Sequence, residues 1–141
     1  MGYTHYWSGH LNSSTSSQLT TDIHKLLSIT STKITGPAGT GDPQISPSSI
    51  NLNGDESADQ AHESLNLPIG QTISFGFCKT ARKPYDEVVG AVLLRCLVYN
   101  QSTFTVWSDG CWEEWGDARV LYQTAFGVEA MMPEGLTLSW S

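Results

Sequence analysis

The chain has 141 residues, a formal net charge of −7 and 10% aromatic residues, a composition typical of one folded domain rather than of a disordered tail. Its seven Lys and Arg are too few to form the extended basic face on which duplex nucleic acid binds, so we expect no duplex partner. Acidic mimicry of DNA is also disfavoured, because the fourteen Asp and Glu form no dense run.

The first half of the chain predicts a strand, a helix and a second strand. Clustered aromatic residues predict a strand at 3–7, and apolar residues at helical spacing predict a helix over 17–30. After a loop rich in Gly, Pro and Ser, a short strand is predicted at 50–53, where the turn dipeptide Asn53-Gly54 ends it.

The second half begins with a predicted strand at 72–77. Ile73, Phe75 and Phe77 alternate there with smaller residues. Because alternate side chains of a strand point to the same side, we expect these three to form its buried face.

The clearest predicted element is a helix that begins near Pro84. Proline suits the first turn of a helix, and Asp86 and Glu87 follow where the helix dipole favours negative charge. From Val88 to Tyr99 the residues are apolar on almost all sides. We therefore expect this helix to be the most buried one.

A strand at 103–107, a helix at 112–124 and a last strand near Leu136–Trp140 complete the predicted order. This order indicates a single α+β domain over residues 1–141, with a mixed or antiparallel sheet and helices packed on one of its faces. The first six elements match a ferredoxin-like βαββαβ core, to which a C-terminal helix is added.

Cysteine usage and hydropathy predict a cytoplasmic protein. Cys78, Cys96 and Cys111 are an odd set without CxxC spacing, as expected for reduced thiols. The start of the chain lacks a signal peptide, and the longest apolar run, Val88–Leu94, is too short to span a bilayer, so we expect no membrane partner. Neither metal-ligand spacing nor a dinucleotide-binding glycine pattern is found, and we predict no metal or cofactor.

The positive charge of the chain is concentrated before the most apolar helix. Lys79, Arg82 and Lys83 lie between the predicted strand and the helix start. A helix N-terminus offers free N–H groups and a positive dipole end, so these cations predict an anion site. The alternative is that they are solvated loop charges, as most Lys and Arg are.

The first strand carries a second group of candidate residues. Strand alternation places Tyr3, His5 and Trp7 on one face and Thr4 and Tyr6 on the other. The first three could frame a base or a pocket, or they could belong to the core.

Polar residues near helix starts are equally ambiguous. Ser108 and Asp109 could bind sugar hydroxyls or act as acid and base, or they could form a helix cap; Asp86 could be only a first-turn residue. Cys78 would need a His partner to act as a nucleophile, although the cations beside it would lower its pKa.

Four motifs resemble a family of small proteins of unassigned activity that are encoded in bacteriophages, prophages and bacterial genomes. The motifs are GYTHYW (Gly2–Trp7), Asn53-Gly54, FCKTARKPYD (Phe77–Asp86) and SDG (Ser108–Gly110). The resemblance spans nearly the whole chain. It departs at Leu52 and Leu65, where aromatic residues are expected.

A small phage-encoded protein of this kind resembles the sponges that sequester nucleotide immune signals, such as ADP-ribose derivatives or cyclic nucleotides, in the cytoplasm of the infected host. The resemblance thus implies an anti-defence protein that binds a small anionic, nucleotide-like ligand without cleaving it. In such a site, cations would bind the phosphate, aromatic rings would surround the base, and Asp or Asn would bind the ribose hydroxyls. Small sponges often form multimers, so a homo-oligomer is one state to test. The candidate ligand-binding residues are Tyr3, His5, Trp7, Asn53, Cys78, Lys79, Thr80, Arg82, Lys83, Tyr85, Asp86, Ser108 and Asp109.

Two other hypotheses stay open. The protein could be an enzyme that acts on the same class of ligand, with Asp86, Asp109 or His5 as general acid or base. It could instead inhibit a host protein through exposed Trp residues.

Overall fold

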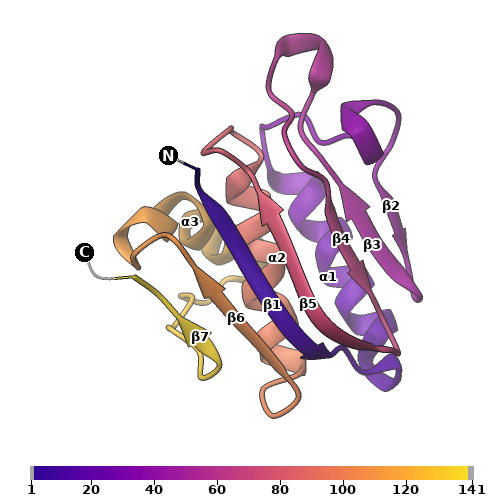
Figure 1. The fold of residues 1–141 in the computed structure, drawn as a ribbon, viewed down its shortest axis with the longest axis vertical. Helices are drawn as coiled ribbons and strands as arrows, with labels where there is room; N and C mark the ends of the chain where they lie inside the picture. Colours follow the sequence, from indigo (N-terminus) through magenta and orange to yellow (C-terminus); the bar gives the residue numbers. More distant parts are fainter. Residues whose placement is uncertain (1, 140–141) are drawn as a thin grey trace.

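A computed structural model describes residues 2–139, which form three α-helices and seven strands (Figure 1). The helices are α1 (Ser16–Ile29), α2 (Asp86–Tyr99) and α3 (Gly116–Phe126). The strands are β1 (Thr4–His10), β2 (Gln44–Ser46), β3 (Ser49–Leu52), β4 (Leu65–Pro68), β5 (Thr72–Lys79), β6 (Phe104–Ser108) and β7 (Leu136–Thr137).

The larger sheet has the strand order β5-β1-β6-β7. β1 is antiparallel to both β5 and β6, so β5 and β6 run in the same direction on either side of it. The chain passes from β5 to β6 through α2, which makes a split β-α-β unit of the ferredoxin-like type. β7 pairs in parallel with β6, so the sheet is mixed.

A second, antiparallel sheet of β2, β3 and β4 lies beside β5 (Figure 1). The predicted strand at 50–53 corresponds to β3, whereas β2 and β4 were not predicted. Both are short and close to a proline, Pro47 or Pro68, which weakens a strand signal. The last predicted strand is β7, and position 140 lies outside the described residues.

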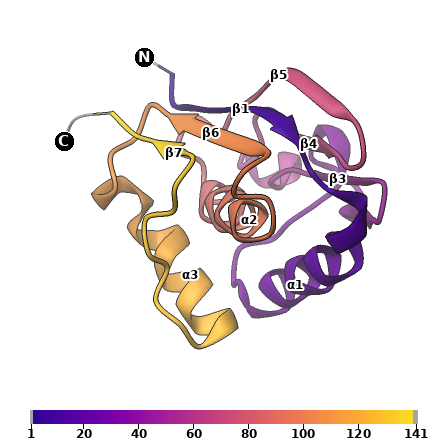
Figure 2. The ribbon, with the colours of Figure 1, turned by 90° about the horizontal axis from the view of Figure 1, so that it is seen from below.

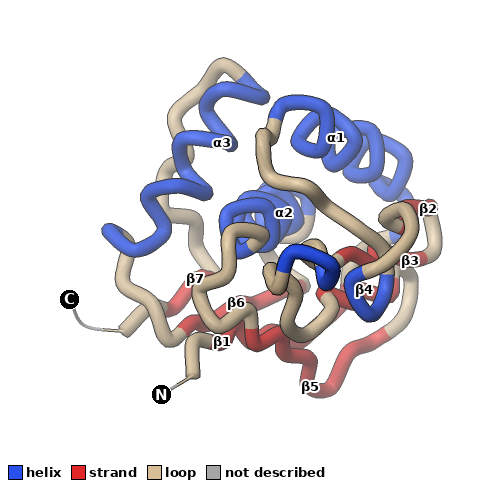
Figure 3. The backbone as a smooth tube through the Cα atoms, turned by 90° about the horizontal axis from the view of Figure 1, so that it is seen from above, coloured by secondary structure: helices blue, strands red, loops and turns tan. Residues whose placement is uncertain are grey.

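All three helices cover one face of the larger sheet (Figures 2 and 3). α2 lies against the sheet, and α1 and α3 flank it. Residues 88–94 of α2 are all buried, which confirms the prediction that this helix is the most buried one. The predicted single α+β domain with helices on one sheet face is confirmed. No helix within residues 2–139 combines the length and the apolar character that a bilayer crossing requires.

The prediction for the buried face of β5 is wrong for Phe75 and Phe77, whereas Ile73 is half-buried and packs against the core. Phe75 and Phe77 are 55% and 52% exposed, whereas Cys78 is fully buried. The reason lies on the helix side of the sheet, where the Trp7 indole occupies the space above Gly76. A Cβ at Gly76 would lie 2.1 Å from Trp7 Nε1, so no other residue fits without a shift. With the glycine facing inward, the flanking phenylalanines face outward.

The contact between α2 and α3 gives a test of this packing. A Cβ at Gly90, in the middle of α2, would lie 2.8 Å from the Cβ of Ala118 on α3. Alanine is intrinsically better than glycine in a helix, yet we expect Gly90→Ala to lower the free energy of unfolding by about 1–3 kcal/mol, because overpacking pushes the helices apart. Urea unfolding measures this change.

Gly116→Ala is the matched control. Gly116 begins α3, and a Cβ added there meets nothing within 4 Å. The free energy of unfolding of the control should lie within about 0.5 kcal/mol of that of the unmodified chain, or slightly above it. Equal stability of the two variants would contradict the close approach of α2 and α3.

Candidate functional site

Most of the predicted ring and polar residues are buried. Side-chain exposure decides whether a ligand can reach a residue without opening the core. Eight of the predicted residues have an exposed fraction of 9% or less: Tyr3, His5, Trp7, Asn53, Cys78, Thr80, Tyr85 and Ser108. The predicted shared face of Tyr3, His5 and Trp7 is therefore the core face, and of these three rings Tyr3 alone reaches the lining of a surface pocket.

His5 is 1% exposed and joins three elements. Its Nδ1 lies 2.8 Å from Ser108 Oγ at the end of β6, and its Nε2 lies 2.7 Å from Asp86 Oδ1 at the start of α2. The same Asp86 oxygen accepts a hydrogen bond from the Thr80 hydroxyl at 2.6 Å. The structure thus brings together four of the predicted residues in one network, of which His5, Thr80 and Ser108 are buried and Asp86 is half-buried.

The protons of this network can be assigned from its geometry. Ser108 Oγ accepts hydrogen bonds from Gly110 N at 3.0 Å and from Trp115 Nε1 at 3.3 Å. Its own proton is left for His5 Nδ1, so we assign His5 Nε2 as the nitrogen that donates to Asp86. A nucleophilic serine needs a reachable oxygen, and Ser108 is 7% exposed with every bonding position filled. The Ser-His-Asp line therefore links β1 to the end of β6 and to the start of α2.

Asn53 is also used internally. Its Oδ1 accepts hydrogen bonds from Gly54 N and His62 N, and its Nδ2 donates to His62 O and Ser64 Oγ. The fully buried amide closes the loop between β3 and β4 and has no group left for a ribose hydroxyl. Asp109, although exposed, accepts a hydrogen bond from the backbone N–H of Thr4 at 3.0 Å.

Cys78 and Tyr85 secure the same loop. The Tyr85 hydroxyl and the Cys78 thiol both donate to the carbonyl of Glu63, at 2.6 and 3.3 Å. Burial raises the pKa of the Cys78 thiol to about 12, instead of the decrease that the neighbouring cations were expected to cause. The thiol is thus protonated at neutral pH and is a poor nucleophile.

The three predicted cations do not converge. Arg82 forms an ion pair with Glu114 and lies over the Tyr3 ring, 4.1 Å from its centroid. This ion pair holds the pKa of Glu114 below its usual value. The Lys83 ammonium donates to the carbonyl of Asp59 at 3.0 Å. Lys79 is the last residue of β5 and follows the buried Cys78, so its side chain lies on the other side of the sheet from the core.

A pocket of about 210 Å³ does lie between the strand-to-helix connection and α3. It is lined by Tyr3, Arg82, Lys83, Pro84, Asp86, Glu87, Glu114, Asp117 and Ala118. Two cations face four carboxylates there, and the pocket is smaller than the ~300–1,000 Å³ usual for ligand pockets. This junction pocket is therefore poorly suited to an anion.

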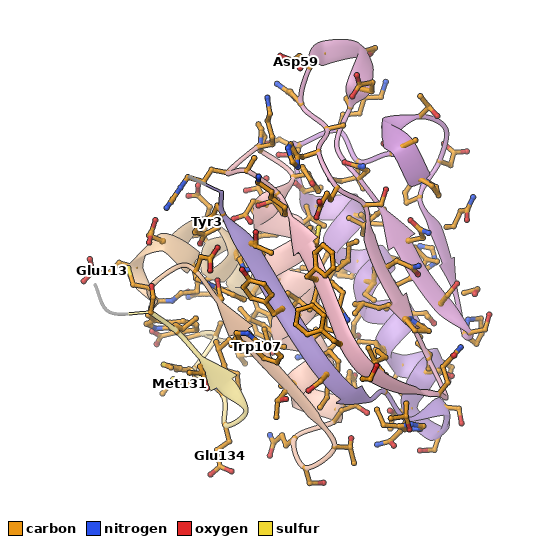
Figure 4. The ribbon with its side chains drawn as sticks, in the orientation of Figure 1. Tyr3, Asp59, Trp107, Glu113, Met131 and Glu134 are labelled. Atoms are coloured by element: carbon orange, nitrogen blue, oxygen red, sulfur yellow. The ribbon has the colours of Figure 1, made fainter. Side chains whose placement is uncertain are left out.

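The uncovered face of the larger sheet carries the most distinctive feature of the surface. Four rings from three adjacent strands form what we call the aromatic face: Tyr6, Phe75, Phe77 and Trp107. Trp107 is labelled in Figure 4. The Tyr6 and Trp107 rings are stacked with centroids 5.7 Å apart, and Phe75 lies 6.1 Å from each and 5.7 Å from Phe77. Exposed apolar clusters of this kind mark interaction sites.

A depression of about 300 Å³ opens at one end of the aromatic face, where β1 begins and β5 ends. It is lined by Thr4, Tyr6, Glu63, Phe75, Phe77 and Lys79. Among the predicted site residues, Lys79 alone lines it. This cavity, which we call the face cavity, combines aromatic rings, one cation and one carboxylate.

The sequence offered one signal for the aromatic face, namely the alternation of Ile73, Phe75 and Phe77. The pattern was interpreted correctly as a strand, but Phe75 and Phe77 were placed on the wrong side of the sheet. A register shift opposite Trp7 and Gly9 interrupts the alternation between Gly76 and Ile73, and Ile73 packs against the core. Tyr6 and Trp107 join the two phenylalanines only through strand register, because Tyr6 is paired with Phe77 and with Trp107. Register between distant strands is not visible in one sequence.

The fold and this surface define a small α+β domain with an aromatic, uncovered sheet face. No protein-family model matches the chain, and no curated protein and no solved structure matches it either. Within residues 2–139, no group of three or more His, Cys, Asp and Glu side chains is arranged to hold a metal ion.

The buried network can be tested at Asp86. In Asp86→Ala, the buried side chains of His5 and Thr80 each lose their acceptor, so we expect the free energy of unfolding to fall by roughly 2–4 kcal/mol. Thermal or urea unfolding measures the loss.

Asp117→Ala is the control, since Asp117 is an exposed aspartate in the first turn of α3 and reproduces only the loss of a helix-dipole interaction. It should cost less than about 1 kcal/mol. An Asp86→Ala variant as stable as this control would show that Asp86 has no structural role.

Proposed function

We propose that this protein binds and sequesters a small nucleotide-like ligand, whose base stacks on the aromatic face. The observation that carries the proposal is the placement of Phe75 and Phe77, both more than half exposed, beside the Lys79 ammonium in one cavity. Solvent-exposed rings are retained at a cost in solubility, which a binding role explains.

The arrangement suits a planar ring. Stacking of a base on an aromatic side chain contributes about 1–3 kcal/mol. Aromatic rings on the central strands of a helix-backed sheet are also the means by which a common RNA-binding fold stacks bases, an analogy at the level of the fold alone. Here the rings lie on β1, β5 and β6, the adjacent strands of the larger sheet.

Charge supports a small ligand over a polymer. A chain with a net charge of −7 repels a long polyanion, and the face cavity offers one cation, Lys79, to acceptor atoms of a ligand. A cavity of about 300 Å³ lies at the lower end of the range for small-molecule sites.

Sequestration is favoured over conversion by the lining of the cavity. Glu63 is the one carboxylate among its lining residues, and they include no His, Cys or Ser. The resemblance to phage-encoded proteins makes nucleotide immune signals the first ligands to try, including ADP-ribose derivatives and cyclic nucleotides. The proposed role is therefore anti-defence by binding.

The proposal predicts which substitutions weaken binding. Calorimetric titration with a panel of nucleotides should give a saturable, one-site isotherm. The double variant Phe75→Ala and Phe77→Ala should weaken binding at least tenfold, because each lost stacking contact is worth about 1–3 kcal/mol. Lys79→Ala should weaken it several-fold. Ligand released by heating should be chemically unchanged.

Val120→Ala and Met131→Ala are matched controls, since both remove exposed apolar side chains, 65% and 74% exposed, that do not line the face cavity. They should leave the affinity unchanged. The proposal fails if no nucleotide binds, or if Arg82→Ala and Lys83→Ala abolish binding while the phenylalanine variant retains it. It also fails if the chain sediments as a dimer that the phenylalanine substitutions dissociate, because the aromatic face would then be an interface between copies.

A further inference from the structure

Glu63 and Lys79 are fixed next to each other at the edge of the face cavity. The backbone N–H of Glu63 donates to the carbonyl of Lys79 at 3.1 Å. In return, Glu63 Oε1 accepts a hydrogen bond from the backbone N–H of Lys79 at 2.7 Å. These two bonds orient the carboxylate along the edge of β5, and both side chains line the same cavity as Phe75 and Phe77.

Both charges remain free to meet a ligand. Among the ion pairs within residues 2–139, none involves Glu63 or Lys79. The second oxygen of Glu63 has no hydrogen-bond partner among the described residues, and the Lys79 ammonium has none either. The lining of the cavity thus includes one group that donates, one group that accepts and the rings of Tyr6, Phe75 and Phe77.

We propose that the ligand carries a guanine base, with its O6 and N7 on the Lys79 ammonium and its N1–H and N2 amino group on the Glu63 carboxylate; this inference rests on the proposed function. Around its edge guanine presents two acceptors followed by two donors. An ammonium only donates and a carboxylate only accepts, so the adjacent pair matches that order.

The other bases do not match this pair. Adenine places its N1 acceptor where the carboxylate needs a donor, and its amino group meets the ammonium. Uracil offers one N–H between two carbonyl oxygens, and cytosine pairs its amino group with an acceptor nitrogen. A site built for paired donors rejects analogues that lack them, because its polar groups are then left unpaired.

Titration of the unmodified chain with GMP, AMP and guanosine tests the inference by calorimetry. GMP should bind at least tenfold more tightly than AMP. Guanosine should bind within about threefold of GMP, because the cation contacts the base rather than the phosphate. The same titrations on Glu63→Gln should reduce the GMP affinity at least tenfold without weakening the binding of AMP. The glutamine keeps a carbonyl oxygen for Lys79 N–H but replaces the second acceptor with a donor.

Glu134→Gln is the control, since Glu134 is exposed and lies at the turn before β7, away from the aromatic face (Figure 4). It should behave as the unmodified chain does. Equal affinities for GMP and AMP in the unmodified chain would overturn the guanine assignment while leaving the proposed function standing. Absence of binding by every nucleotide would overturn both. A Glu63→Gln chain that keeps its preference for GMP would also overturn the assignment.

Discussion

The contact between the Trp7 indole and Gly76 determines which side chains of β5 are exposed to solvent. Trp7 is 1% exposed, and its ring fills the space that a side chain on β5 would otherwise occupy. Since strand side chains alternate, this one contact fixes the phase of β5 and places Phe75 and Phe77 on the uncovered face. A register slip by one residue would bury the phenylalanines and drive the strand against Trp7. The surface proposed to bind a ligand is thus a consequence of how the core is filled.

The second constraint is the network around His5. It connects the first strand to the start of α2 and to the end of β6 through hydrogen bonds of the buried His5 and Thr80 side chains. Such networks are costly when partly satisfied and specify a unique arrangement when complete. Thr80 and Asp86, two polar residues of the segment FCKTARKPYD, therefore connect the end of β5 to the start of α2. Lys79 differs from its neighbours because it belongs to the outer side of β5.

Local sequence patterns predicted what depends on local physics. Helical spacing and continuous apolar character were sufficient for α2, and alternation was sufficient for β5. The side on which β5 would be buried depended on Trp7, more than sixty positions earlier in the chain. The role of Glu63 depended on a loop that folds back to reach Lys79. Clustered charge likewise suggested one anion site. In the structure Lys79 lies on the outer side of β5, whereas Arg82 forms an ion pair with Glu114 at the junction pocket.

The central claim is that the planar base of a ligand stacks on the uncovered sheet face. The aromatic protons of the side chains on that face report such stacking directly. Aromatic NMR spectra of the labelled chain, recorded during titration with GMP, follow Tyr6, Phe75, Phe77 and Trp107 together. Ring-current shifts should appear on these four side chains and not on the buried ring of Tyr85. Unchanged signals at saturating nucleotide, or shifts centred on residues of the junction pocket, would contradict the account.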